Sequence, residues 1–176
     1  MSGRIPILFD RAIHPEWIDF ALEQFLASNN EAELRATLRR FMSGHVAGVF
    51  TQQKTALQLQ RAVGYRSALT RKELEVYYER MAALKPDERG ALRLEILCRS
   101  NRFFADNVAA LRKLRVSGRD YAELQHLYER LTAIYGDRGM VHRRVRYVLQ
   151  TLANFGCVTN AKGKWCIGDS LMAGKS

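Results

Sequence analysis

The chain has 176 residues, with 28 Lys and Arg against 18 Asp and Glu, and a net charge of +10. This length is sufficient to bury an apolar core in one domain or a small pair of domains without disulfide bonds. Cys98, Cys157 and Cys166 are too few and too scattered for a secreted disulfide scaffold. Charged residues interrupt every apolar stretch and no signal pattern opens the chain, which predicts a cytoplasmic protein without a membrane span.

The positive charge is unevenly distributed along the chain. Residues 1–50 carry five Lys and Arg against six Asp and Glu, whereas residues 51–176 carry 23 against 12. A basic region of this kind favours association with a polyanion. We therefore expect nucleic acid to be the partner of the chain.

Apolar periodicity and end signals predict a series of helices. The apolar run from Ile5 to Phe9 predicts an ordered arm, which either pairs as an edge strand or packs against a helix. Beyond it, apolar residues recur at helical spacing. The expected helices lie at 15–27, between Asn30 and Gly44, from a cap at Thr51 to Val63, between Thr70 and Pro86, from a cap at Asp87 to about Leu97, and at about 103–115, 121–135 and 140–155.

Three of these helices are expected to begin with a capping box, in which a polar N-cap residue is followed three residues later by Glu. The pairs are Asn30 with Glu33, Thr70 with Glu73, and Asp120 with Glu123. No long alternating β pattern occurs, so we predict a mainly α protein: a helical bundle with a C-terminal winged-helix-like subdomain and a small β-hairpin. The expected organisation is an N-terminal helical region (1–100), the winged-helix-like subdomain (101–168) and a flexible tail (169–176).

The spacing of elements after residue 101 favours the winged-helix interpretation. Three short helices joined by loops of a few residues precede a hairpin, as in winged-helix domains. Phe155-Gly156-Cys157-Val158 resembles the helix stop and first wing strand of many bacterial winged-helix regulators. Asn160-Ala161-Lys162-Gly163 is a fitting turn, with Gly163 free to adopt a positive φ, before the strand Lys164-Trp165-Cys166-Ile167.

The last helix and the hairpin carry the candidate binding residues. Between Arg138 and Gly168 there are six Lys or Arg and no Asp or Glu. Arginine offers a bidentate fork to guanine, and lysines at a wing tip suit phosphate or minor-groove contact. The predicted nucleic-acid-binding residues are Arg138, His142, Arg143, Arg144, Arg146, Tyr147, Gln150, Lys162 and Lys164.

A Gln-rich helix at 51–63 has two interpretations. Gln can pair with adenine in the major groove, so this helix could read DNA. Alternatively, its Gln, Lys and Arg residues fill a solvated helix face, while Leu57, Leu59 and Val63 pack inward. The second interpretation requires no ligand and is favoured.

Part of the chain resembles a known bacterial group. Within Ala91–Val158, the stretches Asn101-Arg102-Phe103-Phe104-Ala105-Asp106 and Tyr135-Gly136-Asp137-Arg138 resemble small helical, winged-helix proteins of phage-defence (BREX, BrxA-like) loci. The resemblance covers less than half of the chain. It implies a nucleic-acid-binding accessory protein of a bacterial defence system.

The sequence offers no catalytic or metal-binding set. The segment from Gly168 to Gly174 has five residues between its glycines, where a phosphate-binding loop has four. His14, His45, His126 and His142 are irregularly spaced, and the cysteines form no C-x-x-C pair; Cys157 and Cys166 are expected to be packing residues. We therefore expect no cofactor, no metal and no enzymatic activity.

The leading hypothesis is a non-enzymatic protein that binds double-stranded DNA, as a homodimer because symmetric half-sites gain affinity. Two alternatives remain: a helical adaptor or scaffold subunit that binds mainly protein in a larger complex, and an RNA-binding helical protein. Trp17, Phe20 and Phe25 belong either to a dimer interface or, by the favoured interpretation, to an ordinary core.

Overall fold

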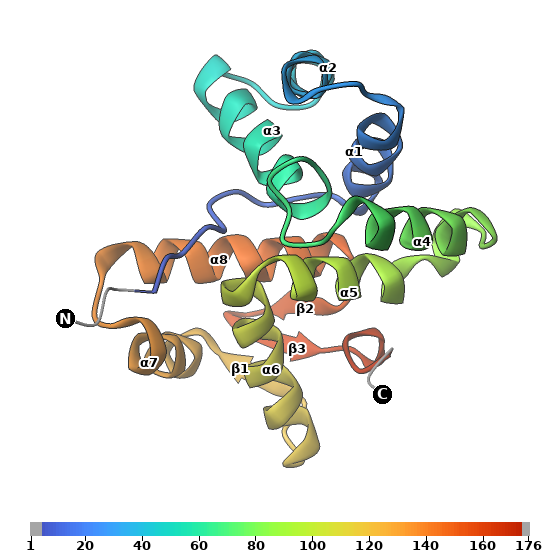
Figure 1. Cartoon of the computed structure of the whole chain (residues 1–176). Helices are drawn as coiled ribbons and strands as arrows, with labels where there is room; N and C mark the ends of the chain where they lie inside the picture. The colour runs from blue at the N-terminus through green and yellow to red at the C-terminus, as the bar shows by residue number, and fades with distance from the viewer. Residues whose placement is uncertain (1–4, 174–176) are drawn as a thin grey trace. The chain divides into compact units, whose positions relative to one another are not determined.

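The computed structural model describes residues 5–173 and divides into two compact units (Figure 1). Residues 13–101 form one, called here the helical unit. Residues 5–12 and 102–173 form the other, called the sheet unit. The protein is mainly helical with a small antiparallel sheet near its C-terminus, which confirms the predicted fold class.

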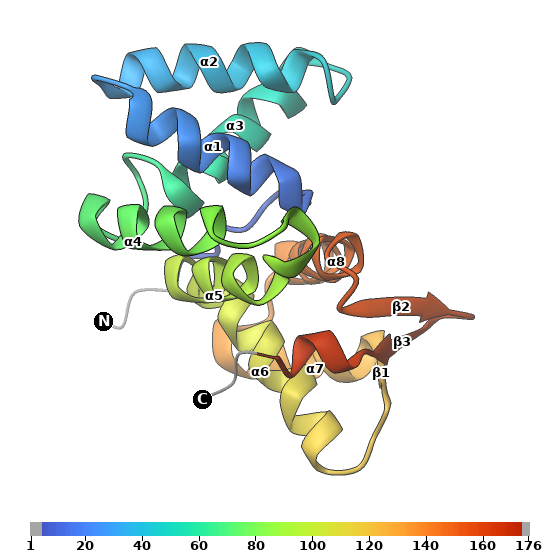
Figure 2. The ribbon, with the colours of Figure 1, turned by 90° about the vertical axis from the view of Figure 1, so that its right-hand side faces the viewer.

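The helical unit contains five α-helices and one 3-10 turn. In chain order these are α1 (Pro15–Ala27), α2 (Glu31–Ser43), α3 (Val49–Val63), α4 (Arg71–Ala82), η1 (Pro86–Glu88) and α5 (Gly90–Ser100). Helices α1, α2 and α3 pack on one another, and Figure 2 shows α1 and α2 side by side. Trp17 and Phe25 are buried in the core of this unit, whereas Phe20 is half-buried and stacks on Phe41.

One predicted capping box is complete in the helical unit, and only the N-cap half of another forms. The Thr70 hydroxyl accepts a hydrogen bond from the Glu73 amide, while the Glu73 carboxylate accepts one from the Thr70 amide at 2.8 Å. Asn30 Oδ1 accepts from the Glu33 amide at 2.9 Å. Each pair satisfies amides that the first turn of a helix leaves unpaired.

Two other predicted helix starts are wrong. Helix α3 begins at Val49, two residues before Thr51, because Gly48 adopts φ 86° and turns the chain into the helix earlier. Asp87 does not cap α5. It lies inside η1, and Pro86 at the start of that turn favours its φ angle.

The sheet unit alternates helices with short strands. In chain order it contains α6 (Arg102–Val116), β1 (Tyr121–Glu123), α7 (Leu124–Tyr135), α8 (Gly139–Asn154), β2 (Val158–Ala161), β3 (Lys164–Ile167) and η2 (Asp169–Leu171). The strand order is β1-β3-β2, and both pairings are antiparallel. Figure 2 shows the β2–β3 hairpin extending away from α7 and α8.

The predicted capping box at Asp120 and Glu123 is wrong. Residues 121–123 form strand β1, in which Ala122 lies opposite Trp165 and is 2% exposed. Helix α7 therefore begins at Leu124, three residues later than expected from Tyr121. Pairing with a strand about forty residues further along the chain overrides a local capping pattern here.

The N-terminal arm is ordered but is not a strand. Residues 5–12 adopt no regular secondary structure, with Ile7 and Phe9 buried, and the Phe9 and Phe104 ring centroids lie 5.2 Å apart. Of the two predicted arrangements, the arm adopts the one in which it packs against a helix. At the other end, Leu171 is buried in η2, whereas residues 174–176 of the predicted tail lie outside the described residues.

Candidate nucleic-acid interface

Helix α8 has two chemically distinct faces. Its apolar face, formed by Val141, Val145, Val148, Leu149 and Leu152, is fully buried, as its spacing predicted. The opposite face leaves His142, Arg143, Arg146 and Gln150 exposed. Because residues 142, 146 and 150 are spaced by four residues and residue 143 is three residues before 146, these four side chains share one side of the helix. We call these four residues the α8 stripe.

The turn before α8 fixes how the helix begins. Gly136 ends α7 with φ 88°, a conformation that side chains rarely adopt, and Arg138 precedes the first turn of α8. The Arg138 guanidinium donates to the Ile5 carbonyl at 2.9 Å, and its buried Nε has no partner within the described residues. Arg138 thus binds the N-terminal arm.

Two further predicted residues also face the arm. The Arg144 guanidinium donates a hydrogen bond to the Ile7 carbonyl. The Arg11 guanidinium lies 5.7 Å from the centroid of the Tyr147 ring, within cation–π range. Arg144 and Tyr147 are half-buried, so they hold the arm and present less surface than the α8 stripe.

Tyr128 of α7 orders two members of the α8 stripe. The His142 and Tyr128 rings stack with centroids 4.0 Å apart, and Arg146 Nε donates to the Tyr128 hydroxyl at 2.9 Å. Since Tyr128 is buried, these contacts hold both exposed side chains against a rigid neighbour. By contrast, Arg143 and Gln150 make no hydrogen bond or ion pair with another described residue.

The hairpin turn places a lysine at its tip. Ala161 pairs with Lys164, so the loop is the two-residue turn Lys162-Gly163, in which both residues have positive φ. The positive φ predicted at Gly163 is confirmed, and Asn160 Oδ1 accepts from the Gly163 amide at 3.2 Å. Lys162 is exposed, while the Lys164 ammonium lies 4.4 Å from the Tyr121 ring centroid.

The cysteines of the hairpin differ in their surroundings. Cys157 is buried, and burial raises the pKa of its thiol. Cys166 is exposed and lies opposite Thr159 in the ladder. Both are free thiols, and the buried one behaves as a small apolar residue.

Three acids of the sheet unit contact side chains outside the α8 stripe. Asp106 accepts from the Tyr135 hydroxyl at 2.6 Å, and both Asp120 and Asp169 pair with Arg115. No acidic residue occurs between Arg138 and Gly168. The α8 stripe and the hairpin tip therefore lie in a segment whose positive charge is not neutralised by neighbours in the sequence.

Comparisons of the chain with protein-family models, curated proteins and solved structures give no significant match. Over residues 5–173, no helix is long and apolar enough to cross a membrane. Nor do these residues bring together three His, Cys, Asp or Glu side chains that could hold a metal ion. Any functional assignment therefore depends on the sequence, geometry and charge of the chain itself.

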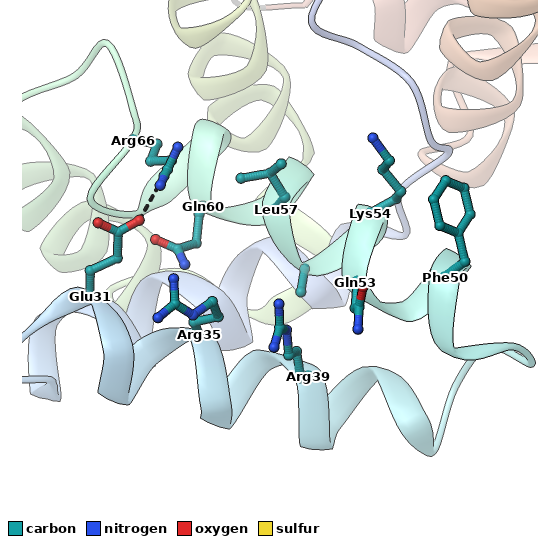
Figure 3. Close-up of a pocket in the computed structure, with 10 residues that line it drawn as sticks. Glu31, Arg35, Arg39, Phe50, Gln53, Lys54, Leu57, Gln60 and Arg66 are labelled. Atoms are coloured by element: carbon teal, nitrogen blue, oxygen red, sulfur yellow. Dashed lines mark hydrogen bonds and ion pairs between the residues drawn. The ribbon is translucent and has the colours of Figure 1, made fainter.

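One feature of the helical unit was missed by the sequence interpretation of residues 51–63. Gln58 and Gln60 are 1% and 2% exposed, so these two do not fill a solvated face. Gln60 lines a pocket between α2 and α3 (Figure 3). The only signal in the sequence was the unusual density of Gln on an otherwise apolar helix, which does not by itself reveal burial.

Proposed function

We propose that the sheet unit is a winged-helix module that binds double-stranded DNA through the α8 stripe and the tip of the β2–β3 hairpin. The order helix, strand, helix, helix, hairpin, with the first strand paired to the last, supports this proposal. The observation that carries it is the exposed α8 stripe, whose two arginines form no ion pair within residues 5–173, opposite a fully buried apolar face.

In this mechanism α8 enters the major groove, which is wide enough to admit a helix. Arg143 makes base or phosphate contacts, because its guanidinium has no competing partner in the described chain. Because Tyr128 already holds the Arg146 side chain in place, Arg146 loses less conformational entropy when DNA binds. Lys162, at the hairpin tip, contacts an adjacent phosphate.

The predicted set of nine residues thus acquires two roles. Arg138, Arg144 and Tyr147 stabilise the N-terminal arm, whereas the α8 stripe and Lys162 contact DNA. Lys164, which is exposed and lies on Tyr121, supplies a further phosphate contact beside the tip. On the strength of the sequence resemblance, we further propose that the protein is an accessory protein of a bacterial phage-defence system.

Fluorescence anisotropy with the full chain tests the proposal, using labelled duplex DNA, single-stranded DNA and RNA. Arg143→Ala is expected to weaken duplex binding roughly tenfold, since one arginine contact is worth about 1–3 kcal/mol. Arg40→Ala removes the same charge from an exposed position of α2 and is the matched control.

The control is expected to change duplex affinity less than about twofold, in line with the small effect of distant charges in salt. Equal losses for the two variants would contradict a local DNA site on α8. Tighter binding of RNA than of duplex by the unmodified chain would favour the RNA-binding alternative. Circular dichroism establishes that Arg143→Ala remains folded, as expected for an exposed residue.

A further inference from the structure

A basic pocket lies between α2 and α3 of the helical unit (Figure 3), whereas the proposed DNA-binding residues belong to the sheet unit. Its volume is about 270 Å³. The charged side chains that line it are Arg35, Arg39, Lys54, Arg66 and Glu31, so four cationic groups face one carboxylate. A concave site with this excess of positive charge selects an anion.

The positive charge of the pocket is only partly compensated. Arg66 Nε pairs with the Glu31 carboxylate at 2.6 Å, at the end of the pocket formed by the start of α2. Arg35 and Arg39 lie one helical turn apart on α2 and, within the described chain, form no ion pair. Two adjacent guanidinium groups without an acidic partner suit the oxygens of one phosphate.

Gln60 supplies the second, independent feature. Its side chain is 2% exposed, and its Oε1 atom has no hydrogen-bond partner among the described residues. Figure 3 shows Gln60 pointing from α3 towards α2, in the space between Arg66 and Arg35. A buried amide oxygen without a donor is unfavourable, so this atom is suited to accept a hydrogen bond from a ligand.

An aromatic face completes the pocket at its far end. Phe50, in the first turn of α3, is 64% exposed, and the Lys54 ammonium lies 5.5 Å from its ring centroid. Exposed aromatic rings beside cationic groups stack on nucleobases. The pocket volume is near the lower limit of about 300–1,000 Å³ for ligand sites, which favours a single nucleotide over a larger molecule.

We propose that this pocket binds a mononucleotide. Arg35 and Arg39 hold its phosphate, Gln60 Oε1 accepts from an amino or hydroxyl group, and the base lies against Phe50. A duplex is a poorer fit, because its phosphates lie on a convex surface and cannot bring a donor to a side chain as buried as Gln60. The proposal does not depend on the DNA-binding function of the sheet unit.

Isothermal titration calorimetry of the full chain with AMP tests this proposal. AMP is the first probe because its base can stack on the Phe50 ring while its phosphate pairs with Arg35 and Arg39. Adenosine, ribose 5-phosphate and inorganic phosphate serve as fragments that each lack part of the ligand. AMP is expected to bind at least tenfold more tightly than each fragment, whereas equal binding of phosphate or ribose 5-phosphate would overturn the assignment to a nucleotide.

Variants locate the site. Arg35→Ala and Arg39→Ala are each expected to weaken AMP binding at least tenfold, while Arg40→Ala, on the same helix but outside the pocket lining, leaves it unchanged. Gln60→Met keeps the length of the side chain but removes the acceptor. It is expected to weaken AMP binding at least fivefold without lowering thermal stability, because it removes an unpartnered polar atom.

Three further results would overturn the proposal: a dissociation constant for AMP above about 1 mM, the weak limit for a specific ligand; equal losses of AMP affinity in Arg40→Ala and Arg35→Ala; or unaltered affinity in Gln60→Met. Duplex binding distinguishes the two proposals. Arg35→Ala is expected to bind duplex DNA like the unmodified chain, and a matching loss of duplex and AMP binding would assign the pocket to DNA. If Arg143→Ala bound duplex as tightly as the unmodified chain, the DNA-binding proposal would fail, but the proposal that the pocket binds AMP would still stand.

Discussion

Glu73 shows how one side chain stabilises two elements of the helical unit. Its carboxylate accepts a hydrogen bond from the Thr70 amide at the start of α4, and the Arg99 guanidinium of α5 donates to the same carboxylate at 2.9 Å. The hydrogen bond from the Thr70 backbone, followed by the interactions with Arg99, holds the pKa of Glu73 below its model-compound value of 4.5. The folded state therefore favours the ionised form.

This shift has a defined consequence for the pH dependence of stability. Because the pKa of Glu73 is lower in the folded chain than in the unfolded chain, its contribution is fully present above pH 4.5 and is lost as pH falls through the folded pKa. Glu73→Gln is expected to lower the urea midpoint at pH 7, with a smaller difference at pH 3. Urea unfolding followed by circular dichroism measures both.

Glu75→Gln is the matched control for this prediction. Glu75 is on the same helix and is exposed, with its carboxylate 3.8 Å from Arg71, but it caps nothing. Its substitution is expected to change the midpoint less than Glu73→Gln at pH 7. A difference for Glu73→Gln that stays constant between pH 7 and pH 3 would contradict the proposed role of the carboxylate charge.

At the tip of the β2–β3 hairpin, the residue that would best stabilise the turn is not the residue that would best bind a phosphate. Lys162 adopts φ 52°, a left-handed conformation in which Asn and Gly are preferred over Lys. Lysine is nevertheless the residue at the turn that carries a positive charge. We therefore expect Lys162 to contribute a phosphate contact at the expense of hairpin stability.

Lys162→Asn separates these two effects. The substitution is expected to raise the free energy of unfolding by about 0.5–1 kcal/mol, since Asn is better suited to a type I′ turn. It is also expected to weaken duplex binding and to reduce the magnitude of the log–log salt slope by about 0.9, the value for one phosphate contact. Urea unfolding and anisotropy over a salt series measure the two quantities.

Lys164→Asn controls for the loss of charge at the hairpin without a gain in turn geometry. Lys164 is in strand β3 and packs on Tyr121, so its substitution is not expected to stabilise the chain. If Lys162→Asn stabilises the protein but leaves duplex affinity unchanged, Lys162 does not contact DNA.

The elements that the sequence predicts well are those whose signals are local. The Thr70–Glu73 capping box forms as expected because both residues and the amides they satisfy lie in one turn. The same spacing at Asp120 and Glu123 fails, because β1 is determined by pairing with β3, which lies far along the chain. Local patterns cannot report such distant pairing.

The same difference between local and distant signals applies to the candidate sites. The apolar face of α8 could be predicted from helical periodicity, so the exposed stripe opposite it could be predicted too. The contacts of Arg138 and Arg144 with the N-terminal arm could not be predicted, because Ile5 and Ile7 are more than 130 residues away in sequence. The burial of Gln60 was equally hidden, since it arises where α2 covers α3.

At the scale of the whole molecule, a net charge of +10 and a local basic surface predict different salt dependences. If the chain bound duplex through its general charge, many phosphates would be neutralised and the log–log slope would approach −9, at about −0.9 per phosphate. The exposed cations of the proposed surface are Arg143, Arg146, Lys162 and Lys164. Four phosphate contacts give an expected slope of about −3.6.

Anisotropy of the unmodified chain with a labelled duplex, measured over a series of salt concentrations, determines this slope. A value of about −3 to −4 is expected if the α8 stripe and hairpin account for binding. A slope near −9 would mean that the charge of the molecule as a whole drives association, and a slope near zero would exclude phosphate contacts. Because Arg40→Ala removes one general charge but no proposed contact, it is expected to leave the slope unchanged, whereas Arg143→Ala reduces its magnitude if that arginine contacts phosphate.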